Sequence, residues 1–258
     1  MSDKSIGFIG GGRVTRILLE GWTRANALPA NVVVSDCNAD TLAKLKARLP
    51  DVRTIAESRT AAAQELVFLA VHPPAVADVA AQIKATLRPD AVLISLAPKF
   101  TVANLTGLLG GFARLARVIP NAPSLIGQGF NPVTFGPALA PADRMEVQAL
   151  LAPLGESPEV AEEKLEAYAI LSAMGPTYLW FQLQALREVA AGFGLSDAEI
   201  APALKRMVCG GTRTLLESGL TPADVLDLIP VKPLAEMEPQ VVELYRTRLP
   251  ALFRKLKP

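Results

Sequence analysis

The residues with the clearest chemical potential lie at the start of the chain, where Gly10, Gly11 and Gly12 follow an apolar run over residues 6–9. An amphipathic segment begins directly after them. This order is typical of a strand, a tight turn and a helix N-terminus, whose free N–H groups bind anions. Gly12 has no Cβ to hold a phosphate away from the backbone. The pattern predicts a site for the pyrophosphate of a dinucleotide.

Three residues near this turn bear on the choice of coenzyme. Asp36 follows the second apolar run, and an acidic side chain there binds a ribose 2′-hydroxyl and repels a 2′-phosphate. Arg13, in the glycine turn, could instead pair with that phosphate. Cys37 stands where phosphate-selective sites usually have arginine. The sequence favours NAD(H) over NADP(H) and leaves both open. At the third position of the glycine pattern stands Thr15, which predicts slightly looser packing of helix on strand.

Candidates for catalysis are few. His72 is the single histidine and follows the third apolar run, so contact with the coenzyme ribose or a plain loop role is favoured over proton transfer. Thr177 could present a hydroxyl to a substrate, and Tyr178 is better suited to packing. Lys232 could hold a carboxylate as a point charge, although a solvated lysine is the simpler interpretation.

The elements that must position these residues alternate along the first half of the chain. Continuous apolar runs separated by helical patterns predict a parallel sheet covered on both faces. In such a sheet ligands lie beyond the carboxyl ends of the strands, here residues 10–12, 35–37, 72–74, 97–99 and 120–123. We expect strands over residues 6–9, 31–35, 65–71, 91–96 and 114–119, and helices over 14–27, 39–49, 75–87 and 102–109.

The second half of the chain has helical periodicity and no convincing strand. We expect a Rossmann-type, doubly wound domain over residues 1–158 and an all-helical domain over 159–258. Several helical segments are apolar on more than one face, so a second subunit should cover them. The helices are expected over 163–192 with a kink near Gly175 and Pro176, over 197–218, over 222–228, and from there to the C-terminus.

Composition narrows the class of protein. Half of the 258 residues are apolar and a fifth are charged, which suits a globular protein with a large core. The net charge of +1 and the lack of a basic stripe argue against nucleic acid and anionic membranes as partners. Cys37 and Cys209 are far apart and suggest reduced thiols. With no signal peptide or membrane-spanning run, we expect a soluble cytoplasmic protein without a metal site.

Several motifs together resemble those of pyrroline-5-carboxylate reductase, and the resemblance covers most of the chain. The most specific is the segment Pro-Asn-Ala-Pro at residues 120–123, preceded by Arg117, Val118 and Ile119. The others are Gly-Phe-Ile-Gly-Gly-Gly at 7–12, Ala-Val-His-Pro at 70–73, Gly-Pro-Thr-Tyr at 175–178, Gly210, Leu-Leu-Glu-Ser-Gly at 215–219, Pro222 and Asp227.

The resemblance implies a homodimer formed through the helical domain, with further assembly of dimers left open. It implies NADPH or NADH as coenzyme and a cyclic imine as the small-molecule substrate, lying between the two domains. By position, it assigns Gly10, Gly11, Gly12, Arg13 and Val14 to the pyrophosphate, Ser35, Asp36 and Cys37 to the adenosine ribose, Val71, His72, Pro73 and Ala97 to the nicotinamide ribose, and Asn121 to the nicotinamide.

The residues expected to bind the substrate differ from those of the family. Where the family has a Ser-Pro-Gly-Gly-Thr-Thr loop that holds the substrate carboxylate, residues 231–236 read Val-Lys-Pro-Leu-Ala-Glu. A helix glutamate of the family is Gln184, and the Ser-Gly-Ser-Gly-Pro entry to that helix is Ser-Ala-Met-Gly-Pro at 172–176. Each lost donor to a carboxylate would cost about 1–3 kcal/mol. The catalytic residues therefore remain unassigned, with Thr177, Lys232 and Asn121 as candidates.

The leading hypothesis is an NAD(P)H-dependent reductase of a cyclic imine, with 1-pyrroline-5-carboxylate, the precursor of proline, as one candidate substrate. The chemistry suits the sequence, because a protonated imine needs positioning more than an acid–base pair. The alternatives are a related two-domain dehydrogenase, of the β-hydroxyacid, prephenate or deazaflavin-dependent NADP reductase type, and a non-catalytic dinucleotide-binding regulator.

Overall fold

The computed structural model describes residues 4–257 and divides the chain into two compact units. The first is Met1–Met174 together with Leu252–Pro258, and the second is Gly175–Ala251. The sequence places the boundary after residue 158. Residues 159–174 group instead with the first unit because Glu159 pairs with the backbone of Val133, and Glu162 and Glu166 form ion pairs with Arg117.

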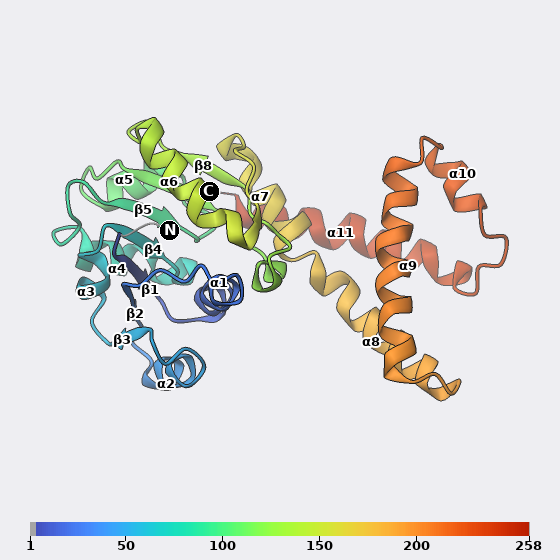
Figure 1. The fold of residues 1–258 in the computed structure, drawn as a ribbon. Coiled ribbons are helices and arrows are strands. Elements are labelled where there is room, and N and C mark those ends of the chain that lie inside the picture. Colours follow the sequence, from blue (N-terminus) through green and yellow to red (C-terminus); the bar gives the residue numbers. More distant parts are fainter. Residues whose placement is uncertain (1–3, 258) are drawn as a thin grey trace. The chain divides into compact units, whose positions relative to one another are not determined.

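A seven-stranded sheet forms the centre of the first unit (Figure 1). All neighbouring strands are parallel except the last pair. The expected wholly parallel sheet of five strands is therefore corrected: a short edge strand is added at each side, and one is antiparallel. In the order β3-β2-β1-β4-β5-β6-β8, the strands are β3 Arg53–Ile55, β2 Val32–Ser35, β1 Ile6–Ile9, β4 Leu66–Leu69, β5 Val92–Ser95, β6 Leu115–Val118 and β8 Val133–Phe135. Two further strands, β7 Gly129–Phe130 and β9 Gly155–Glu156, pair with each other.

Helices cover both faces of this sheet, because alternate residues of each buried strand point to opposite sides. One core cluster joins the sheet to α1, α2 and α6, and a second joins it to α3, α4 and α5. The expected helices are present, while α3 and α6 are additional. Their bounds are α1 Arg13–Arg24, α2 Ala39–Arg48, α3 Ser58–Ala62, α4 Val76–Ile83, α5 Val102–Leu108, α6 Pro141–Leu151 and α7 Leu165–Tyr168.

A cluster of aromatic side chains fixes α1 against the sheet. The rings of Phe8 and Phe68, on adjacent strands, stack with their centroids 4.4 Å apart. Trp22 of α1 packs edge-on against Phe68 and is fully buried. Its indole N–H donates to the carbonyl oxygen of Leu150 at 2.8 Å, so the buried indole donor is satisfied. This packing holds the N-terminus of α1 at the end of β1.

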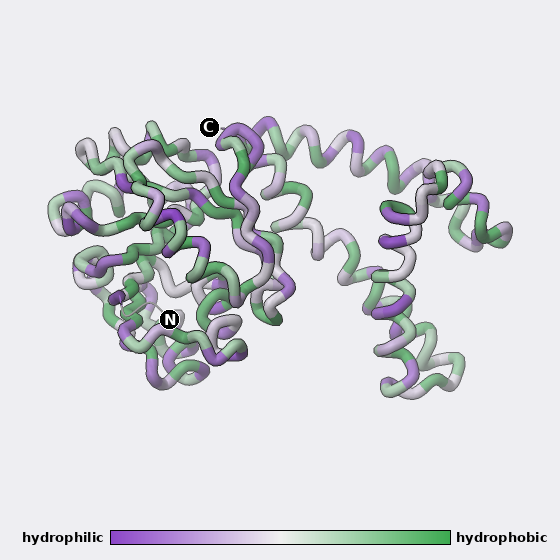
Figure 2. The backbone as a smooth tube through the Cα atoms, turned by 45° about the horizontal axis from the view of Figure 1, so that its top comes forward, coloured by the Kyte–Doolittle hydropathy of each residue, from purple (hydrophilic) through white to green (hydrophobic). Residues whose placement is uncertain are grey.

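The second unit is helical, as expected. A turn of π-helix at Ala169–Ala173 precedes it. In residues 175–251, all of which are described, Ile200 is the single buried residue, and α8 has none. Figure 2 shows apolar positions along these helices as well as in the sheet. No helix within residues 4–257 has both the length and the apolar character to cross a bilayer. The helices are α8 Pro176–Gly192, α9 Asp197–Glu217, α10 Pro222–Asp227 and α11 Glu238–Leu256, the end of which belongs to the first unit.

Candidate dinucleotide-binding site

The turn between β1 and α1 is shaped by Gly10. Its φ of +104° lies in a region that side chains rarely adopt. A Cβ at this position would also overlap the carbonyl oxygen of Ala70, which follows β4. The amide of Gly10 donates to the carbonyl oxygen of Ser35 at 2.7 Å. The turn is therefore locked between β2 and β4, where the strand order reverses and ligands of such sheets bind.

Thr15 gives the turn a bond that glycine could not make. Its hydroxyl donates to the carbonyl oxygen of Gly10 at 2.5 Å, and its side chain is fully buried. The loose packing expected from the sequence is offset here, because the hydroxyl ties the first turn of α1 to the glycine turn.

Space for a phosphate lies over Gly12, which is the N-cap residue of α1 and has an extended backbone with φ −71° and ψ −162°. A Cβ built on Gly12 has no atom within 4 Å. The first amides of α1 have no intrahelical acceptor, and no side chain caps them. This open space above free N–H groups fits the pyrophosphate of a dinucleotide.

Two cavities adjoin the turn. The first, of about 580 Å³, extends over the ends of β1, β2 and β4 and contains Ser35, Asp36 and Cys37. The second, of about 480 Å³, lies beside it, and the two share Gly12, Ala70, Val71 and His72. The first is lined by Ile9, Gly10, Gly12, Ser35, Asp36, Cys37, Asn38, Thr41, Ala56, Ser58, Ala70, Val71, His72, Ala75, Asp78, Val79 and Gln82, and the second by Gly12, Arg13, Val14, Ala70, Val71, His72, Pro73, Leu96 and Pro98.

Most of the residues expected to bind the coenzyme thus line these two adjoining cavities. The role of each residue in binding stays a prediction. The sequence does not predict the part of the cavity formed by Ala56 and Ser58, because neither β3, which ends just before Ala56, nor α3, which begins at Ser58, has a clear apolar pattern. It also does not predict the side chains that α4 contributes, among them Asp78 and Gln82. The apolar spacing of α4 predicted the helix, but not which of its polar residues face the cavity.

Asp36 is bound to the glycine turn itself. One oxygen of its carboxylate accepts from the amide of Gly11, and the other accepts from the amide of Asn38, both at 2.8 Å. The Asn38 side chain in turn caps α2 by accepting from two amides of its first turn. The carboxylate therefore joins the β1–α1 turn to the β2–α2 turn and lies in the wall of the larger cavity.

Asn121, expected near the nicotinamide, uses both ends of its amide within the first unit. Its Oδ1 accepts from the amide of Phe130 at 3.1 Å, and its Nδ2 donates to the carbonyl oxygen of Ser172 at 3.2 Å. It is 8% exposed and lines neither cavity. These bonds make it a brace between the segment after β6 and the π turn before α8. Ala97, also expected at the site, is buried between two cavity residues, Leu96 and Pro98.

A buried ion-pair network supports that part of the cavity wall. Arg117 is 1% exposed, and its guanidinium donates to Glu162 at 2.9 Å and to Glu166 at 2.6 Å. The same oxygen of Glu166 accepts from the amide of Lys99, which has a φ of +75°. A non-glycine residue in that region is strained, by about 1–3 kcal/mol. The network thus holds the loop after β5 in place, a role of Arg117 that the motif around residues 117–123 does not indicate.

Thr177 and Lys232, the other catalytic candidates, both lie in the second unit. Thr177 is in the first turn of α8, and Lys232 is in the exposed segment between α10 and α11. Next to Thr177, Tyr178 packs edge-on against Tyr245, and burial raises the pKa of its hydroxyl, which therefore stays protonated at neutral pH. The structure does not join Thr177, Lys232 and Asn121 into a group within either unit.

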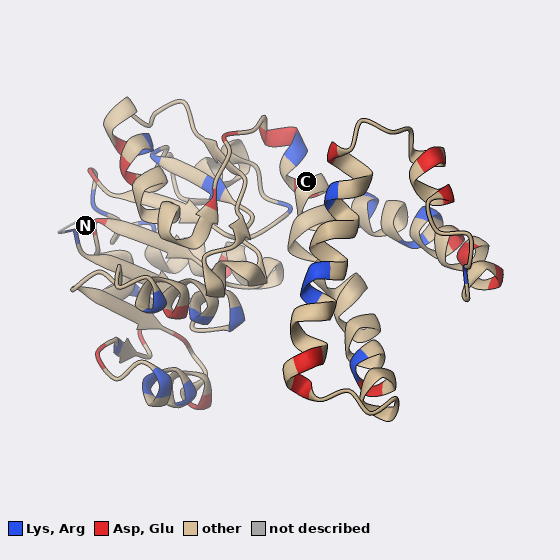
Figure 3. Ribbon diagram, turned by 45° about the vertical axis from the view of Figure 1, so that its right-hand side comes forward, with Lys and Arg blue, Asp and Glu red and all other residues tan. Residues whose placement is uncertain are grey.

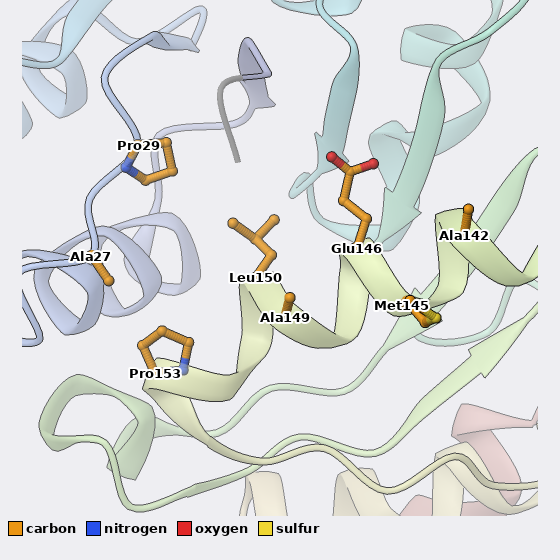
Figure 4. A pocket seen from close by; sticks show the side chains of 8 residues that line it. All are labelled: Ala27, Pro29, Ala142, Met145, Glu146, Ala149, Leu150 and Pro153. Carbon is orange, nitrogen blue, oxygen red and sulfur yellow. The ribbon is translucent and has the colours of Figure 1, made fainter. Parts of the chain in front are cut away.

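A further hollow of the first unit, of about 650 Å³, has a different character (Figure 4). It lies between the loop after α1 and α6, and Glu146 is its single ionisable lining residue. Its other lining residues are apolar, so it lacks the donors that a phosphate needs. No group of three or more His, Cys, Asp or Glu side chains within residues 4–257 is placed to hold a metal ion.

Comparison with known proteins agrees with this geometry. Residues 5–99 match a family model described as NADP oxidoreductase, coenzyme F420-dependent. Pyrroline-5-carboxylate reductase of Corynebacterium melassecola is 28% identical over 224 residues, covering 86% of this chain and 83% of that protein. The enzyme of that name from Escherichia coli K12 is 26% identical over 228 residues, covering 88% and 85%.

Solved structures of similar proteins match nearly the whole chain. The structure of a pyrroline-5-carboxylate reductase from Coxiella burnetii has a TM-score of 0.69 and 26% sequence identity, and the match covers 99% of this chain and 95% of that one. A Plasmodium falciparum pyrroline carboxylate reductase with NADP bound, at 19% identity, shares the fold with a TM-score of 0.76 and the same coverage. By sequence and by fold, the chain is similar to pyrroline-5-carboxylate reductases over most of its length, with a Rossmann-type domain and a helical C-terminal part.

Proposed function

We propose that the protein is a reductase that uses NADH or NADPH to reduce the C=N bond of a cyclic imine. The observation that supports this most directly is the glycine turn at the sheet's switch point, with open space over Gly12 and two cavities beside it. The family likeness supplies the class of reaction. Its Coxiella burnetii and Corynebacterium melassecola relatives are named for the reduction of pyrroline-5-carboxylate.

The residues of this chain would bind and orient the coenzyme. The first amides of α1, beyond Gly12, would hold the pyrophosphate, and Asp36 would lie at the adenosine ribose. Val71, His72 and Pro73 would line the nicotinamide side. When bound, the coenzyme supplies the hydride. A protonated imine is already electrophilic, so the protein's contribution is to hold the two reactants together and to keep water away.

For the substrate we propose only the reacting group, a C=N bond in a ring, and not the substituents on that ring. Residues 231–236 contain no glycine and no hydroxyl side chain that could help to hold a carboxylate, and Lys232 is their one cationic group. Proline synthesis from 1-pyrroline-5-carboxylate is accordingly one member of the proposed class. Imines without a ring carboxylate belong to it as well, because a site that lacks carboxylate donors discriminates less against them.

We also propose that the protein acts as a homodimer in the cytoplasm. The exposed apolar residues of the second unit include Trp180 at 53%, Phe181 at 69% and Phe193 at 81% exposure, too many for a surface that faces water. In a closed symmetric dimer, the same apolar surface of a second copy would pack against these residues and cover them. Free, exposed Cys37 and Cys209 fit a reducing compartment.

The function is tested with purified protein in two stages. Titration with NADH and NADPH, followed by coenzyme fluorescence, should give saturable binding. Turnover is then measured by loss of absorbance of the reduced coenzyme with two sets of cyclic imines, one with and one without a ring carboxylate. Coenzyme binding without turnover of any imine would refute the proposed reaction and would leave the two alternatives, a related two-domain dehydrogenase and a nucleotide-binding regulator.

A further inference from the structure

A cavity of about 340 Å³ in the first unit contains charges of both signs and shares no lining residue with the two coenzyme cavities. It lies where β6 and α7 meet the C-terminal end of the chain, so it gathers segments that are far apart in the sequence. Figure 3 shows acidic segments in red and basic segments in blue next to the C-terminus. The lining residues are Thr101, Arg117, Glu162, Glu163, Glu166 and Lys257.

The wall of this cavity contains polar atoms that have no partner. Arg117 is 1% exposed, and its Nε–H donates to no atom within residues 4–257. Glu162 and the buried Glu166 each use only one carboxylate oxygen, Oε1, for the hydrogen bonds that they accept in the described part of the chain. Buried polar groups almost always have a partner, so a bound molecule that offers both donors and acceptors would complete this network.

The carboxylates of the cavity favour an ammonium group on that molecule. Two positive and three negative side chains leave the cavity with a formal charge of −1. Glu163 has no ion-pair or hydrogen-bond partner for its side chain within residues 4–257. The three carboxylates are not placed to hold a metal ion. An ammonium group suits them better, because its three N–H donors can reach separate acceptors.

The cations of the cavity favour a carboxylate on the same molecule. The ammonium group of Lys257 lies 5.1 Å from the centroid of the Phe253 ring and has no carboxylate partner within residues 4–257. The Nε–H of Arg117 is a second unused donor. Charge-assisted hydrogen bonds to a carboxylate would use both. An α-amino acid carries an ammonium group and a carboxylate on one carbon, and the cavity is large enough for a molecule of this size.

Glu166 links this cavity to the coenzyme site. The same oxygen accepts from the guanidinium of Arg117 and from the amide of Lys99. Lys99, with its φ of +75°, follows Pro98, which lines the smaller coenzyme cavity. A ligand that holds Glu166 in place therefore also holds the strained loop beside the coenzyme.

We propose that this cavity is a regulatory site for a free α-amino acid. The ammonium group of the ligand is bound by Glu162, Glu163 and Glu166. Its carboxylate is bound by Lys257 and Arg117. Occupancy strengthens the binding of the coenzyme, and the coenzyme strengthens the binding of the amino acid by the same factor. The amino-acid site goes beyond the proposed function and does not depend on the proposed reaction.

Calorimetry on the full chain with free alanine tests the site, with ethylamine and propionate as probes that each lack one charged group of alanine. Alanine should bind at least about tenfold more tightly than either probe, because each probe loses charge-assisted hydrogen bonds. Free lysine should bind more tightly than alanine, and free aspartate more weakly, because the cavity has a net negative charge. Equal binding of alanine and of either probe would overturn the inference.

The variant Glu163→Gln distinguishes this cavity from any other place where an amino acid could bind. Glu163 is exposed and makes no contact that the fold needs, so circular dichroism should show an unchanged fold. Alanine should bind about threefold or more less tightly to this variant and to Lys257→Gln. Asp51→Asn is the matched control, because it removes an exposed carboxylate from the turn after α2, and it should leave alanine binding unchanged. Alanine binding that is the same in all three variants would place the ligand elsewhere and overturn the inference.

Fluorescence titration with NADH tests the coupling. At saturating alanine the Kd for NADH should fall about fivefold, at the low end of measured couplings. An unchanged Kd would overturn the regulatory role. Neither measurement requires turnover, so a protein that binds alanine in this cavity but reduces no imine would refute the proposed reaction alone.

Discussion

Replacement of Gly12 by alanine should separate coenzyme binding from folding. The added methyl group meets no atom within 4 Å, and the backbone of Gly12, with φ −71°, is open to alanine. The unfolded chain loses freedom, which stabilises the fold by about 0.4–1 kcal/mol. Alanine is a poorer N-cap than glycine, which costs a similar amount. The two nearly cancel, so Tm should stay within about 2 °C of the wild-type value.

Binding should respond very differently. The same methyl group would project into the space proposed for the pyrophosphate and would keep it from the first amides of α1. The loss of one charge-assisted hydrogen bond of about 2 kcal/mol corresponds to a roughly 30-fold increase in Kd for NADH and NADPH alike. Fluorescence titration measures the Kd, and differential scanning fluorimetry at a fixed protein concentration measures Tm.

Two other glycines serve as controls. Gly10→Ala combines a φ of +104° with overlap of the Ala70 carbonyl oxygen, so it should destabilise the fold itself, by about 3 kcal/mol or more. Gly107→Ala, on α5 and in open space, should stabilise by about 0.5–1 kcal/mol and leave Kd unchanged. If Gly12→Ala bound the coenzyme like the wild-type protein, the pyrophosphate would not lie over this turn.

Three further predictions concern the rest of the molecule. Glu166→Gln should destabilise by about 3–5 kcal/mol because it leaves the buried charge of Arg117 short of a partner, and chemical denaturation should show a smaller loss for Glu166→Asp. Hydrogen bonds from the amide and hydroxyl of Ser5 hold the pKa of Glu65 below its ordinary value, so its ionised form stabilises the fold. The deficit of Glu65→Gln in urea melts should therefore be full at pH 7 and should vanish as the pH falls through the lowered pKa, and a constant deficit would contradict this assignment. Phe181→Glu should shift the protein toward monomer in sedimentation velocity, whereas an unchanged dimer would place the interface elsewhere.

The parts of the fold that the sequence predicts well are those with continuous burial. All four residues of β1, β2, β4, β5 and β6 are buried, so each reads as a mainly apolar run, with Arg117 of β6 as the one charged residue among them. β3 is three residues long and begins with the exposed Arg53, so it carries no such pattern. α6 does have a sequence signal that periodicity alone overlooks, with Pro141 at its first position and Asp143 at its third, where the carboxylate accepts from the amide of the N-cap residue Ala140.

The sequence predicts those site residues that are identified by their immediate neighbours along the chain. Gly12 and Asp36 are each recognised by their place next to a strand. Asn121 could not be assigned in the same way, because its amide bonds to Phe130 and to Ser172, which is 51 residues away along the chain. The hydrogen-bond partners of such a side chain depend on how distant segments of the chain pack, which the residue type alone does not indicate.

The buried hydroxyl of Thr15 has a consequence for the speed of binding. Bonded to the carbonyl oxygen of Gly10, it sets the shape of the turn before any ligand arrives. A receptor loop that is already ordered loses little conformational entropy on capture, and collisions need not wait for a rare open form. We therefore expect stopped-flow association near 10⁶–10⁷ M⁻¹ s⁻¹, with a single phase linear in coenzyme concentration. Thr15→Val, nearly the same size but without the hydroxyl, should slow that phase or make it level off.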